Sequence, residues 1–196
     1  LSIGNIFGLC GMLAGILVVK NGMPIIAVML ITGVAALICG LMNGLVITKT
    51  TVRAFIATLG MSYITMGITY LLAGGKNFAV MVDSFNWLGT GTILGIPVQI
   101  YYMFAIMLIL SLLLNFTKFG RYIYATGSNI TAAKFAGINT TLIRILAHCI
   151  SALLAGWAGV LNTARLFNAS PQNEGSYIEG ICACVIGGVS MAGGTG

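Results

Sequence analysis

Five long apolar stretches constrain this chain more than any other feature of its sequence. An α-helix needs about 20 apolar residues to cross the hydrocarbon core of a bilayer, with a range of about 17–25. The stretches that meet this length are Leu1–Val19, Ile25–Ile47, Ala54–Ala73, Val98–Phe116 and Leu142–Leu161. A sixth stretch, Ile178–Ala192, is too short to cross comfortably alone. The pattern predicts an all-α, polytopic transmembrane domain with about six hydrophobic segments.

The composition excludes a soluble globular protein. Hydrophobic residues make up 59% of the 196-residue chain and charged residues only 6%, whereas a soluble domain carries about 25% charged residues. So few charges cannot cover a water-facing surface of this size. The evenly apolar character favours one membrane domain over residues 1–196.

Basic residues are unequally shared between the two sides that alternating spans would create. The side that holds 117–141 carries Lys49, Arg53, Lys118, Arg121, Lys134 and Arg144, whereas the other side carries Lys20, Lys76 and Arg165. Cytoplasmic loops are enriched in Lys and Arg, so residue 1 and the segment 117–141 are expected at the cytoplasmic face. The basic residues occur singly rather than in a patch or stripe, which argues against nucleic acid as a partner.

The chain offers little for catalysis, and we expect no enzyme. Its one histidine, His148, lies in an apolar stretch with no nucleophile or acid nearby in sequence, and an interfacial or interhelical hydrogen bond is the favoured role. The phosphate-binding Gly-Lys-[Ser/Thr] motif is absent, so any ATP hydrolysis belongs to a partner. No acidic residue lies in the middle of a span, which disfavours ion-coupled transport. The cysteines are expected to serve packing rather than metal binding, and they are Cys10, Cys39, Cys149, Cys182 and Cys184.

The longest polar segment, about 117–141, is the most informative region. Asn129 or Thr131 can cap a short helix that begins near Ala132, and Gly137 can end it. The side chains that would form a small apolar knob on this helix are Ala132, Ala133 and Phe135. Such a projecting helix fits a groove on a soluble partner. The alternative is an amphipathic segment that rests on lipid headgroups.

This segment resembles the cytoplasmic coupling region of permease subunits in bacterial ABC importers for ribose, xylose, galactose and related sugars. The matching positions are Thr117, Phe119, Gly120, Arg121, Ile123, Tyr124, Ala125, Gly127, Asn129, Ala132, Ala133, Gly137 and Ile138. The chain departs from the family pattern at Ser128, where a second glycine is usual, and at Lys134, where arginine is usual.

Further matches follow in the family's order along the chain. They are Leu1-Ser2-Ile3-Gly4, Gly40-Leu41-Met42-Asn43-Gly44, Phe55-Ile56-Ala57-Thr58-Leu59-Gly60-Met61, Gly95-Ile96-Pro97-Val98, Val185-Ile186-Gly187-Gly188-Val189-Ser190 and Gly193-Gly194. Tyr177 and Glu179 replace residues that are usually Glu and Asp, which leaves the substrate open. Family members carry additional spans before and after these landmarks, so the resemblance implies an incomplete permease domain.

The resemblance implies a partner-driven importer of a monosaccharide, a ribose-like pentose or a hexose, in the bacterial inner membrane. Two permease copies, identical or different, would form the pore, and an extracytoplasmic sugar-binding protein would deliver the substrate. ATP and magnesium would bind the partner ATPase subunit, with no cofactor or metal on this chain. The residues expected to couple to that ATPase are Gly120, Arg121, Gly127, Asn129, Ala132, Ala133 and Gly137. Alternatives are a related permease for branched-chain amino acids or nucleosides, and an ion-coupled carrier or channel.

Polar and small residues within the spans have two interpretations each. Side chains that could line a sugar path are Asn43, Thr58, Ser62, Tyr63 and Thr65, although polar groups in membrane helices often bond helix to helix instead. Small residues four apart allow close helix approach, as in Gly4/Gly8, Gly11/Gly15, Gly40/Gly44 and Ala155/Gly159. Packing within the chain is the favoured interpretation, and a dimerisation face is the alternative.

Overall fold

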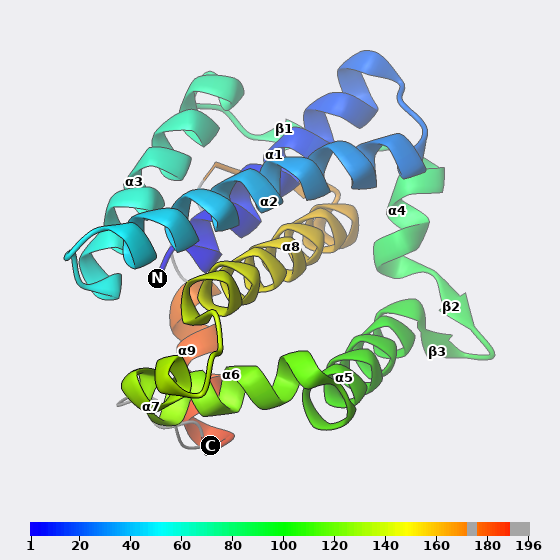
Figure 1. The fold of residues 1–196 in the computed structure, drawn as a ribbon. Helices are drawn as coiled ribbons and strands as arrows, with labels where there is room; N and C mark the ends of the chain where they lie inside the picture. The colour runs from blue at the N-terminus through cyan, green and yellow to red at the C-terminus, as the bar shows by residue number, and fades with distance from the viewer. Residues whose placement is uncertain (172–175, 189–196) are drawn as a thin grey trace.

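Five helices long enough to span a membrane dominate the computed structural model, which describes residues 1–171 and 176–188 (Figure 1). They are α1 (Ile3–Asn21), α2 (Ile25–Lys49), α3 (Ala54–Ala73), α5 (Val98–Phe116) and α8 (Thr140–Leu166). Each corresponds to one of the five predicted stretches. The all-α, polytopic prediction is therefore confirmed.

Shorter elements connect these helices. The helical ones are α4 (Asp83–Thr90), α6 (Lys118–Ser128), α7 (Ile130–Phe135) and α9 (Ser176–Ile186). Within the described ranges, four two-residue strands form two antiparallel pairs, β1 (Phe78–Ala79) with β4 (Asn168–Ala169) and β2 (Thr92–Ile93) with β3 (Ile96–Pro97). The sixth predicted stretch corresponds to α9, while its last residues and the Gly193-Gly194 landmark lie outside the described residues.

Glycines bring α2 against α8. A Cβ atom on Gly40 would lie 2.8 Å from the Cα atom of Cys149, and one on Gly44 would lie 2.8 Å from the Cα atom of Ile145. Real Cβ atoms do not approach a neighbouring backbone that closely, so only glycine permits this contact. The Gly40/Gly44 pair therefore serves packing within the chain, as the sequence predicted.

The same arrangement joins α1 to α8. A Cβ atom on Gly11 would lie 2.9 Å from the carbonyl oxygen of Gly159 on α8. One on Gly15 would lie 2.8 Å from the Cβ atom of Ala169 on β4, which directly follows α8. Helices α1, α2 and α8 thus form the core, which is made largely of small and medium side chains such as Cys10.

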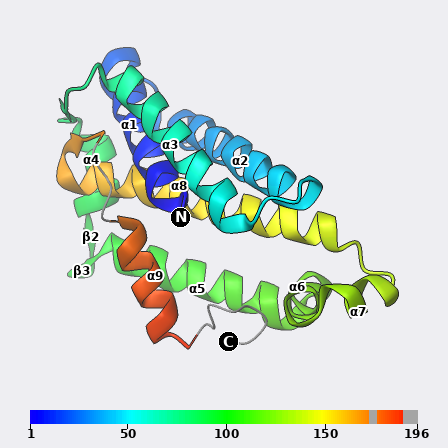
Figure 2. The ribbon, with the colours of Figure 1, turned by 90° about the vertical axis from the view of Figure 1, so that its left-hand side faces the viewer.

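The polar segments lie at two opposite ends of the helix bundle. Figure 2 shows α6 and α7 at one end, beside the start of α8, and α4 with the β2–β3 pair at the other. Because Gly44 of α2 meets Ile145 of α8, the α2–α3 connection also lies toward the α6–α7 end. Lys49 and Arg53 in that connection therefore share an end with the basic residues of α6 and α7.

Candidate functional site: the α6–α7 segment and two polar cavities

Thr117 and Gly120 shape the corner between α5 and α6. Thr117 caps α6, with its hydroxyl oxygen accepting a hydrogen bond from the Gly120 amide at 3.2 Å. Gly120 is buried, and a Cβ atom there would collide with the backbone carbonyl of Leu114. The chain turns sharply after α5 only because residue 120 lacks a side chain. The sequence did not predict α6, although the Thr117 cap was a readable signal for it.

Helix α7 forms where the sequence predicts a short helix, but it begins at Ile130, two residues before the predicted start near Ala132. The Asn129 side-chain oxygen accepts a hydrogen bond from the Ala132 amide at 3.0 Å, which identifies Asn129 rather than Thr131 as the cap. Gly137 has a φ of +79° and donates from its amide to the Lys134 carbonyl at 3.0 Å. This left-handed residue ends the helix without the strain that another residue would carry.

Exposure divides the predicted coupling residues into two groups. Those exposed to solvent are Arg121, Gly127, Asn129, Ala132 and Gly137, whereas Gly120 and Ala133 are buried. Ala133 is only 4% exposed, so its methyl group is not part of the expected surface knob. Phe135, by contrast, is 89% exposed. The apolar knob that α7 presents is therefore formed by Ala132 and Phe135, because Ala133 faces the rest of the chain.

The α6–α7 surface is positively charged. Lys118, Arg121 and Lys134 are exposed, and residues 117–144 contain no acidic side chain. Helix α6 packs against α8, where Thr126 is buried. The α6–α7 pair thus presents the exposed aromatic ring of Phe135 among basic side chains. Such a surface is suited to bind a protein groove with acidic edges.

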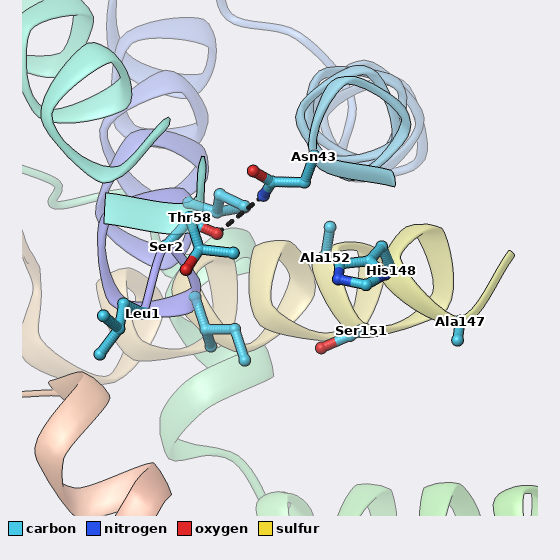
Figure 3. Close-up of a pocket in the computed structure, with 10 residues that line it drawn as sticks. Leu1, Ser2, Asn43, Thr58, Ala147, His148, Ser151 and Ala152 are labelled. Atoms are coloured by element: carbon cyan, nitrogen blue, oxygen red, sulfur yellow. Dashed lines mark hydrogen bonds between the residues drawn. The ribbon is translucent and has the colours of Figure 1, made fainter. Parts of the chain in front are cut away.

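A polar cavity of about 250 Å³ lies where α1, α2, α3 and α8 meet (Figure 3). Its lining includes Ser2, Asn43, Thr58, His148 and Ser151. The Asn43 amide nitrogen donates a hydrogen bond to the Ser2 hydroxyl oxygen at 2.8 Å. The Nδ1 atom of His148 lies 2.8 Å from the carbonyl oxygen of Arg144, and the ring nitrogen is the donor in this bond because a carbonyl oxygen can only accept.

A second cavity, of about 320 Å³, lies between α1 and α3, and both cavities include Leu1 in their lining. Ser62 and Tyr63 line it together with Asn5. The Asn5 amide nitrogen donates to the Ser62 hydroxyl oxygen at 2.6 Å. The structure thus brings four of the five proposed path residues to two neighbouring cavities, since Asn43 and Thr58 line the first.

Thr65, the fifth of those residues, lies elsewhere. It is fully buried, and its hydroxyl donates to the backbone carbonyls of Met61 and Ser62 within its own helix. Sequence reasoning missed Asn5 and Ser151, whose signal was a polar side chain inside an otherwise apolar stretch. Among the described residues, the hydrogen bond of His148 lies within α8, to the Arg144 carbonyl.

The cysteines divide by exposure. Cys10 is buried and lies 3.5 Å from the carbonyl oxygen of Thr32, and Cys39 is also buried. Cys182 and Cys184 are exposed on α9 in the described part of the chain. Over residues 1–171 and 176–188, no group of three or more metal-ligating side chains comes together.

Comparison with known proteins places this architecture in a family. Residues 1–195 match the family described as branched-chain amino acid transport system / permease component. The chain belongs to this family. It is therefore a multi-pass membrane protein, in agreement with its five span-length helices.

Three relatives illustrate the similarity. The ribose import permease protein RbsC of Escherichia coli K12 is 36% identical over 201 residues, covering 100% of this chain and 62% of that protein. RbsC of Haemophilus influenzae gives the same identity and coverage. The autoinducer 2 import system permease protein LsrC of Yersinia pseudotuberculosis is 32% identical over 196 residues, covering 100% of this chain and 56% of that protein. The chain thus spans less than two thirds of these relatives, and no solved structure matches it.

Proposed function

We propose that this chain is the membrane-spanning part of a permease subunit that imports a monosaccharide, a ribose-like pentose or a hexose, across the bacterial inner membrane. The observation that carries the proposal is the similarity of the whole chain to ribose import permeases. The similarity to the autoinducer 2 import system permease LsrC supports import as the direction of transport.

An ATP-binding subunit is the proposed energy source, and it would dock on α6 and α7. The exposed Phe135 and Ala132 would enter a groove of that subunit, and Arg121 would pair with an acidic or carbonyl group at its edge. ATP and magnesium would bind there, so that this chain hydrolyses nothing itself. The excess of basic residues at the α6–α7 end supports a cytoplasmic location for that end.

The remaining partners follow from the same proposal. A second permease copy would complete the pore, and an extracytoplasmic sugar-binding protein would deliver the substrate to the end that holds α4. The two polar cavities are candidate parts of the sugar path, because their side chains offer donors and acceptors that hydroxyl groups can use.

Helix α8 contacts α6 and α7 directly, and α1 packs against α8, so a movement of the docking segment would reach α1 through α8. Ser2 bonds to Asn43 of α2, and Asn5 bonds to Ser62 of α3. Both bonds border a cavity. A nucleotide-driven shift of α1 against α2 and α3 would break or re-form these two hydrogen bonds. It would thereby open or close the two cavities that these residues line, as alternating access requires.

Uptake measurements test the proposed function. Cells that express the full-length permease together with its proposed ATP-binding and sugar-binding partners would be offered labelled ribose, xylose, galactose, leucine and adenosine. Accumulation of one of the sugars, lost when the ATPase is inactivated, is the expected result. Accumulation of leucine or adenosine alone would replace the substrate class, and sugar uptake that persists without the ATPase would favour an ion-coupled carrier.

A further inference from the structure

The β2–β3 hairpin turns on two residues with unusual backbone geometry. Leu94 and Gly95 connect the strands with φ values of +53° and +78°. A two-residue loop with both residues at positive φ is a type I′ turn, in which the first position is normally Asn, Asp or Gly. A leucine there is strained, because its Cβ atom crowds the backbone in the left-handed conformation. Turn chemistry alone therefore does not explain Leu94.

A surrounding of water does not explain a leucine at position 94 either. Leu94 is 93% exposed in the described structure, and the flanking Ile93 and Ile96 are exposed as well. An asparagine would satisfy both the turn geometry and an aqueous surrounding, whereas this hairpin presents three large aliphatic side chains at its tip. A strained and exposed apolar residue indicates an apolar surrounding outside the chain.

The hairpin is attached firmly to the start of α5. The Tyr101 hydroxyl donates to the Ile93 carbonyl at 3.2 Å, and the Val98 amide donates to the Gly91 carbonyl at 2.9 Å. Figure 1 shows β2 and β3 projecting beyond the first turn of α5, and Figure 2 places them at the end opposite to α6 and α7. The position of the tip is therefore fixed relative to this span.

The depth of the hairpin in the bilayer follows from the length of α5. Its 19 residues span about 28 Å at 1.5 Å per residue, which is close to the roughly 30 Å hydrocarbon core. Residues 92–97 directly precede α5 and so lie at the boundary between hydrocarbon and headgroups. The exposed Trp87 and Tyr101 lie at the same end of the helix bundle as the hairpin, and such aromatic side chains are enriched at membrane interfaces.

Charge distinguishes a lipid surrounding from a soluble partner. Residues 84–117 contain no Lys, Arg, Asp or Glu, so the hairpin and α5 form one uncharged stretch. The preceding connection at the same end carries Lys76 and Asp83 instead. Large apolar side chains are exposed both on the hairpin and in the first turns of α5, at Ile93, Leu94, Ile96, Ile100 and Met103.

We propose that the β2–β3 hairpin inserts Leu94 into the interfacial layer of the bilayer at the end opposite to α6 and α7. It thereby anchors the start of α5 at a fixed depth. The occupant of this surface is lipid, and the proposal does not depend on the substrate or on the ATPase.

Spin labels at two positions test this insertion. Leu94→Cys and the control Asn77→Cys, which is exposed in the preceding connection at the same end, would be made in the full-length permease with its native cysteines replaced by alanine. After labelling and reconstitution in phosphatidylcholine–phosphatidylglycerol vesicles, accessibility to oxygen and to a water-soluble nickel chelate would be measured. The expected ratio of oxygen to nickel accessibility is several-fold higher at residue 94 than at residue 77.

Each other outcome overturns the proposal. A label at residue 94 that the nickel chelate reaches as readily as at residue 77 means that the tip lies in water. A label shielded from both reagents means that protein covers it, either a second copy or other parts of the permease. Shielding that appears only when the binding protein is added assigns the hairpin to that partner.

If Leu94→Cys fails to insert, Leu94→Trp with Trp87 and Trp157 changed to Phe gives the same comparison through quenching by brominated lipids.

Discussion

The side-chain amide of Asn43 on α2 donates a hydrogen bond to the hydroxyl oxygen of Ser2, at the start of α1, over 2.8 Å. Asn43 is 4% exposed, and its carbonyl oxygen has no hydrogen-bond partner in the described part of the chain. An unpartnered buried oxygen costs free energy. The residue is thus not optimised for stability alone, which supports a role in transport.

Replacing Asn43 with leucine separates these two roles. Interhelical hydrogen bonds in membrane proteins contribute about 0.6 kcal/mol on average, and removal of the unpartnered oxygen offsets part of that loss. We expect Asn43→Leu to shift the unfolding midpoint in detergent only slightly and to reduce sugar uptake strongly. Thr65→Val is the matched control, because the Thr65 hydroxyl bonds only to carbonyls of its own helix. Full uptake by Asn43→Leu would remove the first cavity from the proposed path.

An added methyl group is expected to affect stability differently at a glycine of α2 and at a glycine of α3. We expect Gly40→Ala to destabilise the protein by about 1–3 kcal/mol, the usual cost of overpacking, because the new Cβ atom would lie 2.8 Å from both Cys149 and Ala152. Gly60 on α3 has open space around it, so Gly60→Ala is expected to be neutral or stabilising through its better helix propensity. Thermal unfolding of the two variants checks this. Equal midpoints would contradict the close α2–α8 contact.

Residue type and spacing were sufficient for some features and not for others. The lengths of the apolar stretches predicted the five spans, and Asn129 with Gly137 predicted a short helix at the position of α7, because these features depend on local chemistry. The burial of Ala133 was missed, since it depends on how α7 folds back on the rest of the chain. Thr65 was placed in the path because sequence does not reveal whether a threonine hydroxyl bonds to its own helix.

Phe135 is the best reporter of partner docking on α7. It is 89% exposed, so Phe135→Ser is expected to leave the unfolding midpoint unchanged while abolishing both uptake and co-purification of the ATP-binding subunit. Phe116→Ser is the control, since Phe116 is also exposed but ends α5, outside the α6–α7 segment. Ala133 is unsuitable for this purpose, because a larger side chain at a buried position disturbs packing. Normal ATPase binding by Phe135→Ser would move the docking surface away from α7.

Gly120 tests whether the angle between α5 and α6 matters for coupling. A Cβ atom at this position would collide with the Leu114 backbone carbonyl, so Gly120→Ala forces α6 away from its present direction. We expect the variant to insert into the membrane, to lose about 1–3 kcal/mol of stability, and to lose most of its uptake because α7 is displaced with α6. Ser128→Ala, a small change at an exposed position at the end of α6 and outside the proposed coupling residues, is the control and should retain uptake. Measuring ATPase activity of the assembled complex identifies the step: activity that no longer responds to substrate indicates broken coupling. Substrate-responsive ATPase activity and normal uptake in Gly120→Ala would show that the α5–α6 corner has no part in coupling ATP hydrolysis to transport.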